Sequence, residues 1–236
     1  RVFEWLATQH PAIVHAAVYD AVNAINRRHA VYAVTVTAPT GASMEIAAAT
    51  AAHDALTGLL PLQQAALDAA LKTSLAQIPD GQAKSDGMRI GGEVAEKILA
   101  LRKTDGAAGK AEYSFNSGAG VYQATPPMNA SPVVPHWRSV KPFMMQSATQ
   151  FPFAGPAEPA SAAFAKDFNE IKSIGGKTSS KRTNEQTAIA IHWSGSEIPP
   201  LNTVARAVSI ERKLGIADNA RLFAYLNMTM ADTLIA

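Results

Sequence analysis

The chain has 236 residues, no cysteine, and 21 lysines and arginines against 19 aspartates and glutamates, so its net charge is only +2. This length suits one large domain or two small ones, and the lack of cysteine excludes disulfides, thiolate metal sites and thiol nucleophiles. The basic residues are scattered along the chain, which argues against nucleic acid as a partner.

Apolar residues recur at three- and four-residue spacing through long alanine-rich stretches. This periodicity predicts an all-α fold, a multi-helix bundle with a long Pro- and aromatic-rich extended arm. No apolar run reaches the ~18 to 20 residues that cross a bilayer, so we expect no membrane span. The N-terminus shows no signal-peptide pattern.

The first four helices are predicted in the N-terminal part of the chain. Residues 10–26 form the first helix, and Ser43 is expected to be the N-cap of the second, over 44–60. The third helix, over 62–77, makes a short-looped antiparallel pair with the second. The fourth covers 82–103, and its Gly91-Gly92 pair is interpreted as a point of close helix packing.

Helical periodicity then stops over residues 109–159, where prolines and aromatic residues alternate. A structureless segment of this length is uncommon in a compact domain, and its aromatic content is too high for a flexible linker. We therefore expect an extended arm that is ordered against the helices, with four aromatic anchors: Trp137, Phe143, Phe151 and Phe153.

Four more helices are predicted after the arm. One covers 161–173 and ends at Gly175-Gly176; the next follows a capping box that begins at Thr183, with Gln186 at the third helical position. A helix over 200–213 and a final one capped by Asp218 complete a set of about eight. The chain stops in mid-helix at Ala236, which reads as a truncation.

The common catalytic motifs are absent. Gly175–Thr178 imitates part of a phosphate-binding loop, but Ile171 stands where its leading glycine belongs, so we interpret the segment as a helix C-cap and turn. The two serine-glycine segments, 116–120 and 193–196, both lack the glycine two residues before the serine that a nucleophile elbow requires. None of the six histidines has a partner at helical metal-ligand spacing, and we expect no metal site within the chain.

Two His–Asp combinations are also interpreted as structural. His15 and Asp20 share a helix but are not three or four residues apart, which argues against a proton relay and for two separate structural hydrogen bonds. The same interpretation applies to His53 beside Asp54.

Several segments, taken in order, resemble the bacterial vanadium-dependent haloperoxidases of the type 2 phosphatidic acid phosphatase superfamily. The segment His15–Ile25 resembles the first-helix signature of that family. The similarity continues through Thr125–Pro127, Pro135–Trp137, Lys141–Phe143, Gln150–Phe151, Gly155–Pro156, Arg182–Thr187, Ile191–Trp193, Asn202 and Ala220–Asp232. The resemblance therefore spans nearly the whole chain and implies a helical scaffold of the haloperoxidase type.

The oxyanion-binding signature of that family does not occur in these residues. It consists of K-x-x-x-x-x-x-R-P, then P-S-G-H, then S-R-x-x-x-x-x-H, and the resemblance places its first lysine a few residues beyond Ala236. In the family these groups hold vanadate, which oxidises halide with peroxide, or phosphate, whose esters are hydrolysed. The catalytic residues are therefore expected beyond Ala236, and vanadate is the implied cofactor, bound by residues outside this chain.

Three residues of this chain are candidates for lining that pocket: His192, Trp193 and Ser194, where the Thr183 helix ends and Gly195 follows. The family has a carboxylate near this point that helps to hold a site arginine, and this sequence lacks it. The opposing interpretation is that Trp193 is a core anchor and His192 a solvated helix-end residue.

Halide oxidation is the closer family match, with acid phosphatase as the runner-up and a non-catalytic helical interaction module as an alternative of another class. The expected partners are the C-terminal half of the same domain and a small-molecule substrate, and a homo-oligomer stays open. Compartment is not decided by the residues; the resemblance implies a soluble, periplasmic or secreted protein.

Overall fold

The structure is a computed structural model that describes residues 4–118, 120–152, 154–179, 181–195 and 198–236. The prediction of an all-α fold is confirmed: these residues form eight α-helices and two short 3-10 helices, with no strand. The chain divides into two compact units. Unit 1 comprises Arg1–Gly109, Trp137–Gln150 and Ile198–Ala236, and unit 2 comprises Lys110–His136 and Phe151–Glu197.

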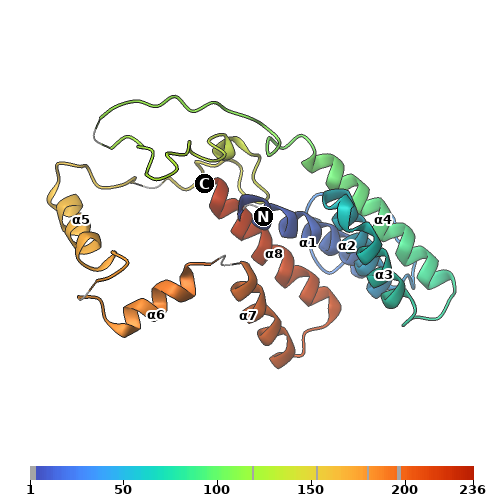
Figure 1. Cartoon of the computed structure of the whole chain (residues 1–236). Coiled ribbons are helices and arrows are strands. Elements are labelled where there is room, and N and C mark those ends of the chain that lie inside the picture. Colours follow the sequence, from blue (N-terminus) through green and yellow to red (C-terminus); the bar gives the residue numbers. More distant parts are fainter. Residues whose placement is uncertain (1–3, 119, 153, 180, 196–197) are drawn as a thin grey trace. The chain divides into compact units, whose positions relative to one another are not determined.

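Unit 1 is organised around α1 (Glu4–Asn26), which packs against α2 (Met44–Leu59), α4 (Gln82–Arg102) and α8 (Ile216–Ile235) (Figure 1). The buried face of α1 is rich in alanine, with Ala12, Ala16, Ala17 and Ala21 fully buried. Alanine leaves room for a neighbouring backbone to approach. The helix starts at Glu4 instead of the predicted His10, and Pro11 lies inside it.

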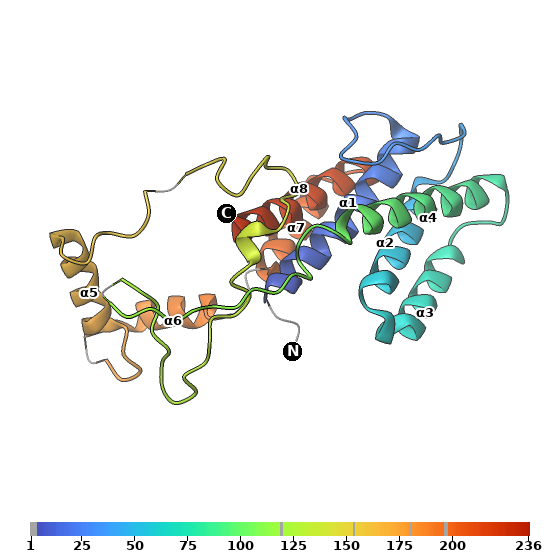
Figure 2. The ribbon, with the colours of Figure 1, turned by 90° about the horizontal axis from the view of Figure 1, so that it is seen from above.

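Close contact between α2 and α4 depends on the absence of a side chain at Gly91. A Cβ atom built there would lie 2.5 Å from the carbonyl oxygen of Ala47 and 2.9 Å from the amide nitrogen of Ala51, both in α2. Figure 2 shows the two helices side by side. The prediction that this glycine pair marks close helix packing is confirmed at Gly91, whereas the space beside Gly92 is limited mainly by the Asp54 side chain.

The remaining helices of unit 1 lie at its edges. The segment predicted as one helix over 62–77 is a 3-10 turn, η1 (Pro61–Gln63), followed by α3 (Gln64–Leu75), which contacts α2 and buries no side chain. Helix α7 (Ile198–Glu211) contacts α8. The side-chain amides of Asn202 and Asn227 donate to each other's oxygen at 3.1 Å, and Asn227 is fully buried.

Helix α8 begins differently from the prediction. Its N-cap is Gly215, and Asp218 lies inside the first turn. Asp218 is an ion-pair partner of Arg28 at 3.5 Å, so its carboxylate faces the α1–α2 connection instead of capping the backbone of α8. An acidic residue in the first turn also interacts favourably with the helix dipole.

Unit 2 holds α5 (Ala162–Ile174) and α6 (Asn184–Trp193), and neither helix buries a side chain. The predicted capping box of Thr183 and Gln186 forms at the start of α6, whereas Ser161, predicted as the first residue of a helix, is the N-cap of α5. The aromatic rings of Tyr113, Phe115 and Tyr122 contact one another, with centroids 5.4 to 6.3 Å apart.

The expected arm is shared between the two units. Its middle part, residues 137–150, belongs to unit 1, where the predicted anchors Trp137 and Phe143 are buried and Trp137 starts the short helix η2 (Trp137–Ser139). The expectation for Phe151 was wrong, because this side chain in unit 2 is 62% exposed. Phe153 lies outside the described residues.

Candidate functional site

Buried charged groups in unit 1 hold loops against helices. The carboxylate of Asp20, on α1, accepts hydrogen bonds of 2.8 to 2.9 Å from the backbone amides of Tyr32, Ala33 and Val34. Burial raises the pKa of Asp20, and the three amides act in the opposite direction. Because both carboxylate oxygens are used by the backbone, Asp20 has a structural role and does not serve as an acid or base.

The second anchoring carboxylate, Asp232 near the end of α8, accepts hydrogen bonds from the backbone amides of Phe143, Met144 and Met145. Arg102, the last residue of α4, stacks on a side chain of the same segment: its guanidinium lies 3.7 Å from the centroid of the Phe143 ring. Asp232 is 3% exposed. The segment 137–150 is therefore fixed on unit 1 by one carboxylate and one cation.

Arg102 is the buried cation of the described core; both of its terminal amino groups are paired, whereas its Nε has no hydrogen-bond partner. It pairs with Asp105 at 2.8 Å and donates to the carbonyl oxygens of Lys141 and Pro142 at 2.7 and 3.3 Å. Gln9 donates to the same Asp105 carboxylate at 2.7 Å. A buried ion pair with these additional hydrogen bonds is a packing element and leaves little capacity to bind an oxyanion.

The histidines of unit 1 play separate roles. His15 stacks on Phe223 with ring centroids 5.5 Å apart, and burial lowers the pKa of His15 to about 4. Asp20, its neighbour on the same helix, bonds to backbone amides instead. The predicted structural hydrogen bonds are therefore found for Asp20, whereas His15 packs by ring stacking.

His53 differs from its prediction, because it bonds directly to Asp54. Its Nδ1 lies 2.6 Å from Asp54 Oδ1, and its Nε2 lies 2.8 Å from Asp68 Oδ1 on α3. Burial lowers the pKa of His53, but the hydrogen bonds and charges of the two carboxylates outweigh it, so the pKa is raised. The group ties α3 to α2, and both ring nitrogens are occupied.

The three predicted pocket residues lie together at the end of α6 in unit 2. The rings of His192 and Trp193 meet edge to face at 4.9 Å, and Ser194 is the C-cap, with its hydroxyl donating to the Ile191 carbonyl at 2.8 Å. All three side chains are exposed, and Trp193 is 52% exposed, so it is not a core anchor of unit 2. Their role as pocket-lining residues stays a prediction.

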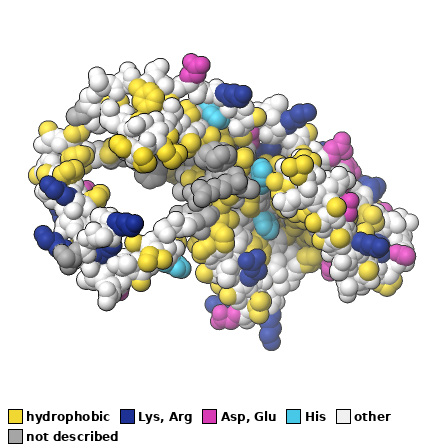
Figure 3. All heavy atoms as spheres, viewed as in Figure 1, with side chains coloured by type: hydrophobic (Ala, Val, Ile, Leu, Met, Phe, Trp, Pro, Cys, Tyr) yellow, Lys and Arg dark blue, Asp and Glu magenta, His cyan; other side chains and the backbone are white. Residues whose placement is uncertain are grey.

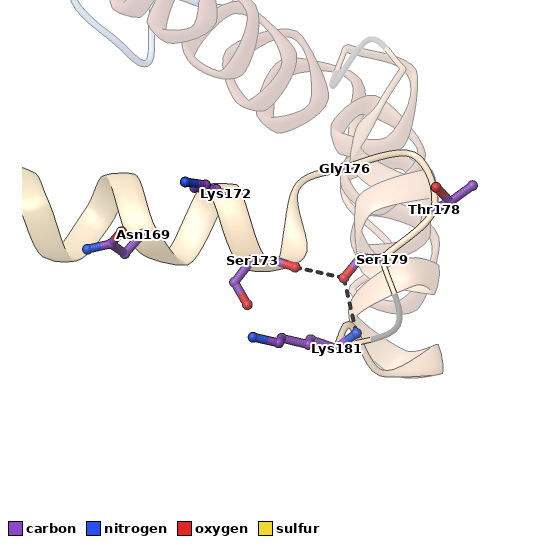
Figure 4. A pocket seen from close by; sticks show the side chains of 7 residues that line it. All are labelled: Asn169, Lys172, Ser173, Gly176, Thr178, Ser179 and Lys181. Carbon is purple, nitrogen blue, oxygen red and sulfur yellow. Dashed lines mark hydrogen bonds between the residues drawn. The ribbon is translucent and has the colours of Figure 1, made fainter.

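Unit 2 also contains a polar pocket that sequence analysis did not identify. It has a volume of about 580 Å³ and lies between the end of α5 and the loop that follows (Figure 4). Its lining residues are Asn169, Lys172, Ser173, Gly176, Thr178, Ser179 and Lys181. Gly175 is the C-cap of α5, so the predicted cap and turn over 175–178 is confirmed at Gly175, and the turn forms one wall of this pocket.

Neither a clustered set of metal ligands nor a candidate membrane helix occurs among the described residues. No group of three or more His, Asp or Glu side chains is arranged there to hold a metal ion. None of the helices in the described ranges combines the length and hydropathy that a membrane crossing requires.

Comparison with known proteins identifies the fold. No protein-family model matches the sequence, and no curated protein matches it. The structure is similar to a solved structure described as the first bacterial vanadium-dependent iodoperoxidase, with a TM-score of 0.76 and 22% sequence identity. The likeness covers 99% of this chain and 63% of that chain. The chain thus has a helical vanadium-haloperoxidase-like fold and spans less than two thirds of the length of the protein it resembles.

Proposed function

We propose that this chain is the helical scaffold half of a vanadate-dependent haloperoxidase-like enzyme, which oxidises halide with peroxide. The observation that carries the proposal is the fold likeness, because it extends over 99% of the chain and therefore includes both units. The similar protein is an iodoperoxidase by its description, which makes iodide the first halide to test.

The oxyanion would be held by residues outside these 236. Within the described residues the fit to vanadate is poor: the buried cation Arg102 is committed to Asp105 and two carbonyl groups, and His15 is enclosed against Phe223. The sequence also lacks the lysine, arginine and histidine signature. No catalytic step is therefore assigned to residues of this chain.

Exposed apolar side chains support a scaffold role. In unit 2, Phe164, Phe168 and Ile171 form an exposed stripe on α5, spaced four and three residues apart. Figure 3 shows hydrophobic side chains on the surface of this unit. In unit 1, α7 exposes Val204, Val208 and Ile210. Apolar surface of this kind is typical of faces that pack against further protein, here the remaining part of the same enzyme.

The proposal includes a role for the end of α6, where His192, Trp193 and Ser194 would line the completed pocket. In the full-length enzyme, replacing His192 or Trp193 with Phe should weaken vanadate affinity or lower halide turnover, with little change in melting temperature. Ile191→Ala is the matched control, because Ile191 is 69% exposed on the same helix. Lower stability with unchanged affinity and turnover per folded molecule would leave these residues a packing role only.

Assays of the full-length gene product distinguish the proposal from its alternatives. Translation of the gene beyond Ala236 should show the K-x-x-x-x-x-x-R-P segment, and iodide oxidation should depend on added vanadate. Hydrolysis of a phosphate ester without halide oxidation would favour the phosphatase. A gene product without the signature would favour a helical interaction module. Fractionation of cells for the same protein would test the proposed periplasmic or secreted location, and light scattering would report a homo-oligomer.

A further inference from the structure

The loop between α5 and α6 is built around Arg182. Its guanidinium donates to the carbonyl oxygens of Ile174 at 2.7 Å, Gly176 at 2.8 Å and Lys177 at 3.4 Å. Its Nε donates to the hydroxyl of Thr187 on α6 at 3.1 Å. Carbonyl oxygens that would repel an anion are thus paired with a cation at the point where α5 ends.

Ser179 closes the same loop against α5. Its hydroxyl donates to the carbonyl oxygen of Ser173 at 2.8 Å and accepts from the backbone amides of Lys181 and Arg182 at 3.2 and 3.3 Å. Figure 4 shows the bonds of Ser179 to Ser173 and Lys181, and the Lys181 side chain extending back along the end of α5. The loop therefore places Lys181 on the pocket that also has Lys172, from α5, in its lining.

The pocket carries positive charge and hydrogen-bond donors. Two lysines, the hydroxyl-bearing Ser173 and Thr178 and the amide-bearing Asn169 are among its lining residues, and no carboxylate residue is; the Ser179 hydroxyl already donates within the loop. Among the residues that the structure describes, no carboxylate forms an ion pair with Lys172 or Lys181. Two unpaired ammonium groups beside hydroxyl donors attract a compact anion with several acceptor oxygens.

We propose that this pocket binds a small phosphate-type oxyanion, either inorganic phosphate or a phosphomonoester. The volume of about 580 Å³ admits either ligand. The site is separate from the oxyanion signature of the haloperoxidases, since neither an arginine nor a histidine lines it. The proposal does not depend on the proposed enzymatic function.

Titration of the 236-residue protein with inorganic phosphate, followed by amide NMR at constant ionic strength, tests the site. The amide signals of Gly176 and Ser179 should shift in a saturable manner. A double variant, Lys172→Gln with Lys181→Gln, should raise the Kd about tenfold. The control is Lys166→Gln with Lys177→Gln, which removes the same charge from exposed residues outside the pocket lining and should change the Kd less than about twofold.

A second titration, with glycerol phosphate, distinguishes the two forms of the ligand. Tighter binding of glycerol phosphate assigns the pocket to phosphomonoesters, and equal binding assigns it to the phosphate group alone; both results support the proposal. Equal weakening in the two double variants would show a general charge effect and overturn it. Absence of saturable shifts at Gly176 and Ser179 up to about 20 mM phosphate would overturn it as well.

Discussion

Asp232 accepts a 2.6 Å hydrogen bond from the backbone amide of Phe143, a residue 89 positions earlier in the chain. Asp20 bonds in the same way to the backbone of residues 32–34. In both cases a carboxylate on a helix of unit 1 holds three consecutive amides of an irregular segment. These contacts explain how a long non-helical segment has a fixed position on the helices without any disulfide.

Replacing Asp232 with Ala should therefore destabilise the protein strongly. The change leaves the amides of Phe143, Met144 and Met145 without their acceptor, and buried unsatisfied amides are costly. We expect the free energy of unfolding, measured by urea denaturation, to fall by about 2 to 4 kcal/mol. Thr233→Ala, at the exposed neighbouring position, is the control and should cost less than about 0.5 kcal/mol. Similar losses in both variants would contradict the anchoring role.

Stability should decrease in acid partly because of His15. Burial lowers the pKa of His15 to about 4 in the folded protein, against about 6.5 in the unfolded chain. The unfolded state therefore binds more protons between these values, so this contribution is complete above about pH 6.5 and is lost as the pH falls toward about 4.

In the variant His15→Phe, which keeps a ring to stack on Phe223, the loss of stability between about pH 7 and pH 5 should be smaller by about 2 kcal/mol. Denaturation curves of both proteins at the two pH values measure this difference. Burial also lowers the pKa of His10, so part of the pH dependence should persist in the variant. Identical pH dependence of the two proteins would show that His15 does not resist protonation.

The two central glycines of α4 should respond in opposite directions to alanine. Gly91→Ala places a Cβ against backbone atoms of Ala47 and Ala51 that cannot move independently, and we expect a loss of about 1 to 3 kcal/mol. Gly92→Ala meets only the Asp54 carboxylate, at 3.1 Å, and gains helix propensity, so it should be neutral or stabilise by up to about 1 kcal/mol. Thermal unfolding of the pair tests this, and equal effects would refute close packing at Gly91.

Sequence reasoning succeeded where the signal is local. The caps at Ser43 and Thr183 depend on residues within three positions of each other, and they form as the pattern indicates. The predicted cap at Asp218 failed, because Gly215 takes the N-cap position and Asp218 pairs with Arg28, from another part of unit 1. An ion pair between residues so far apart in the sequence cannot be predicted from the spacing of neighbouring residues.

For the candidate sites, too, local features could be predicted from the sequence and tertiary contacts could not. The segment Gly175–Thr178 was interpreted as a helix C-cap and turn, and Gly175 is the C-cap. The pocket beside it went unnoticed, since it depends on how Arg182 folds the loop and brings Lys181 to the pocket that Lys172 also lines. Asp68 was likewise missed as a partner of His53, because the two lie on different helices.

The central claim is that this chain is the scaffold of a haloperoxidase-like enzyme whose oxyanion-binding residues lie elsewhere. Iodide oxidation by hydrogen peroxide, measured with and without vanadate, tests it most directly when residues 1–236 alone are compared with the full-length gene product. The full-length protein should oxidise iodide only when vanadate is present, and residues 1–236 alone should show no turnover. Robust vanadate-dependent turnover by residues 1–236 alone, or none by the full-length protein loaded with vanadate, would contradict the claim.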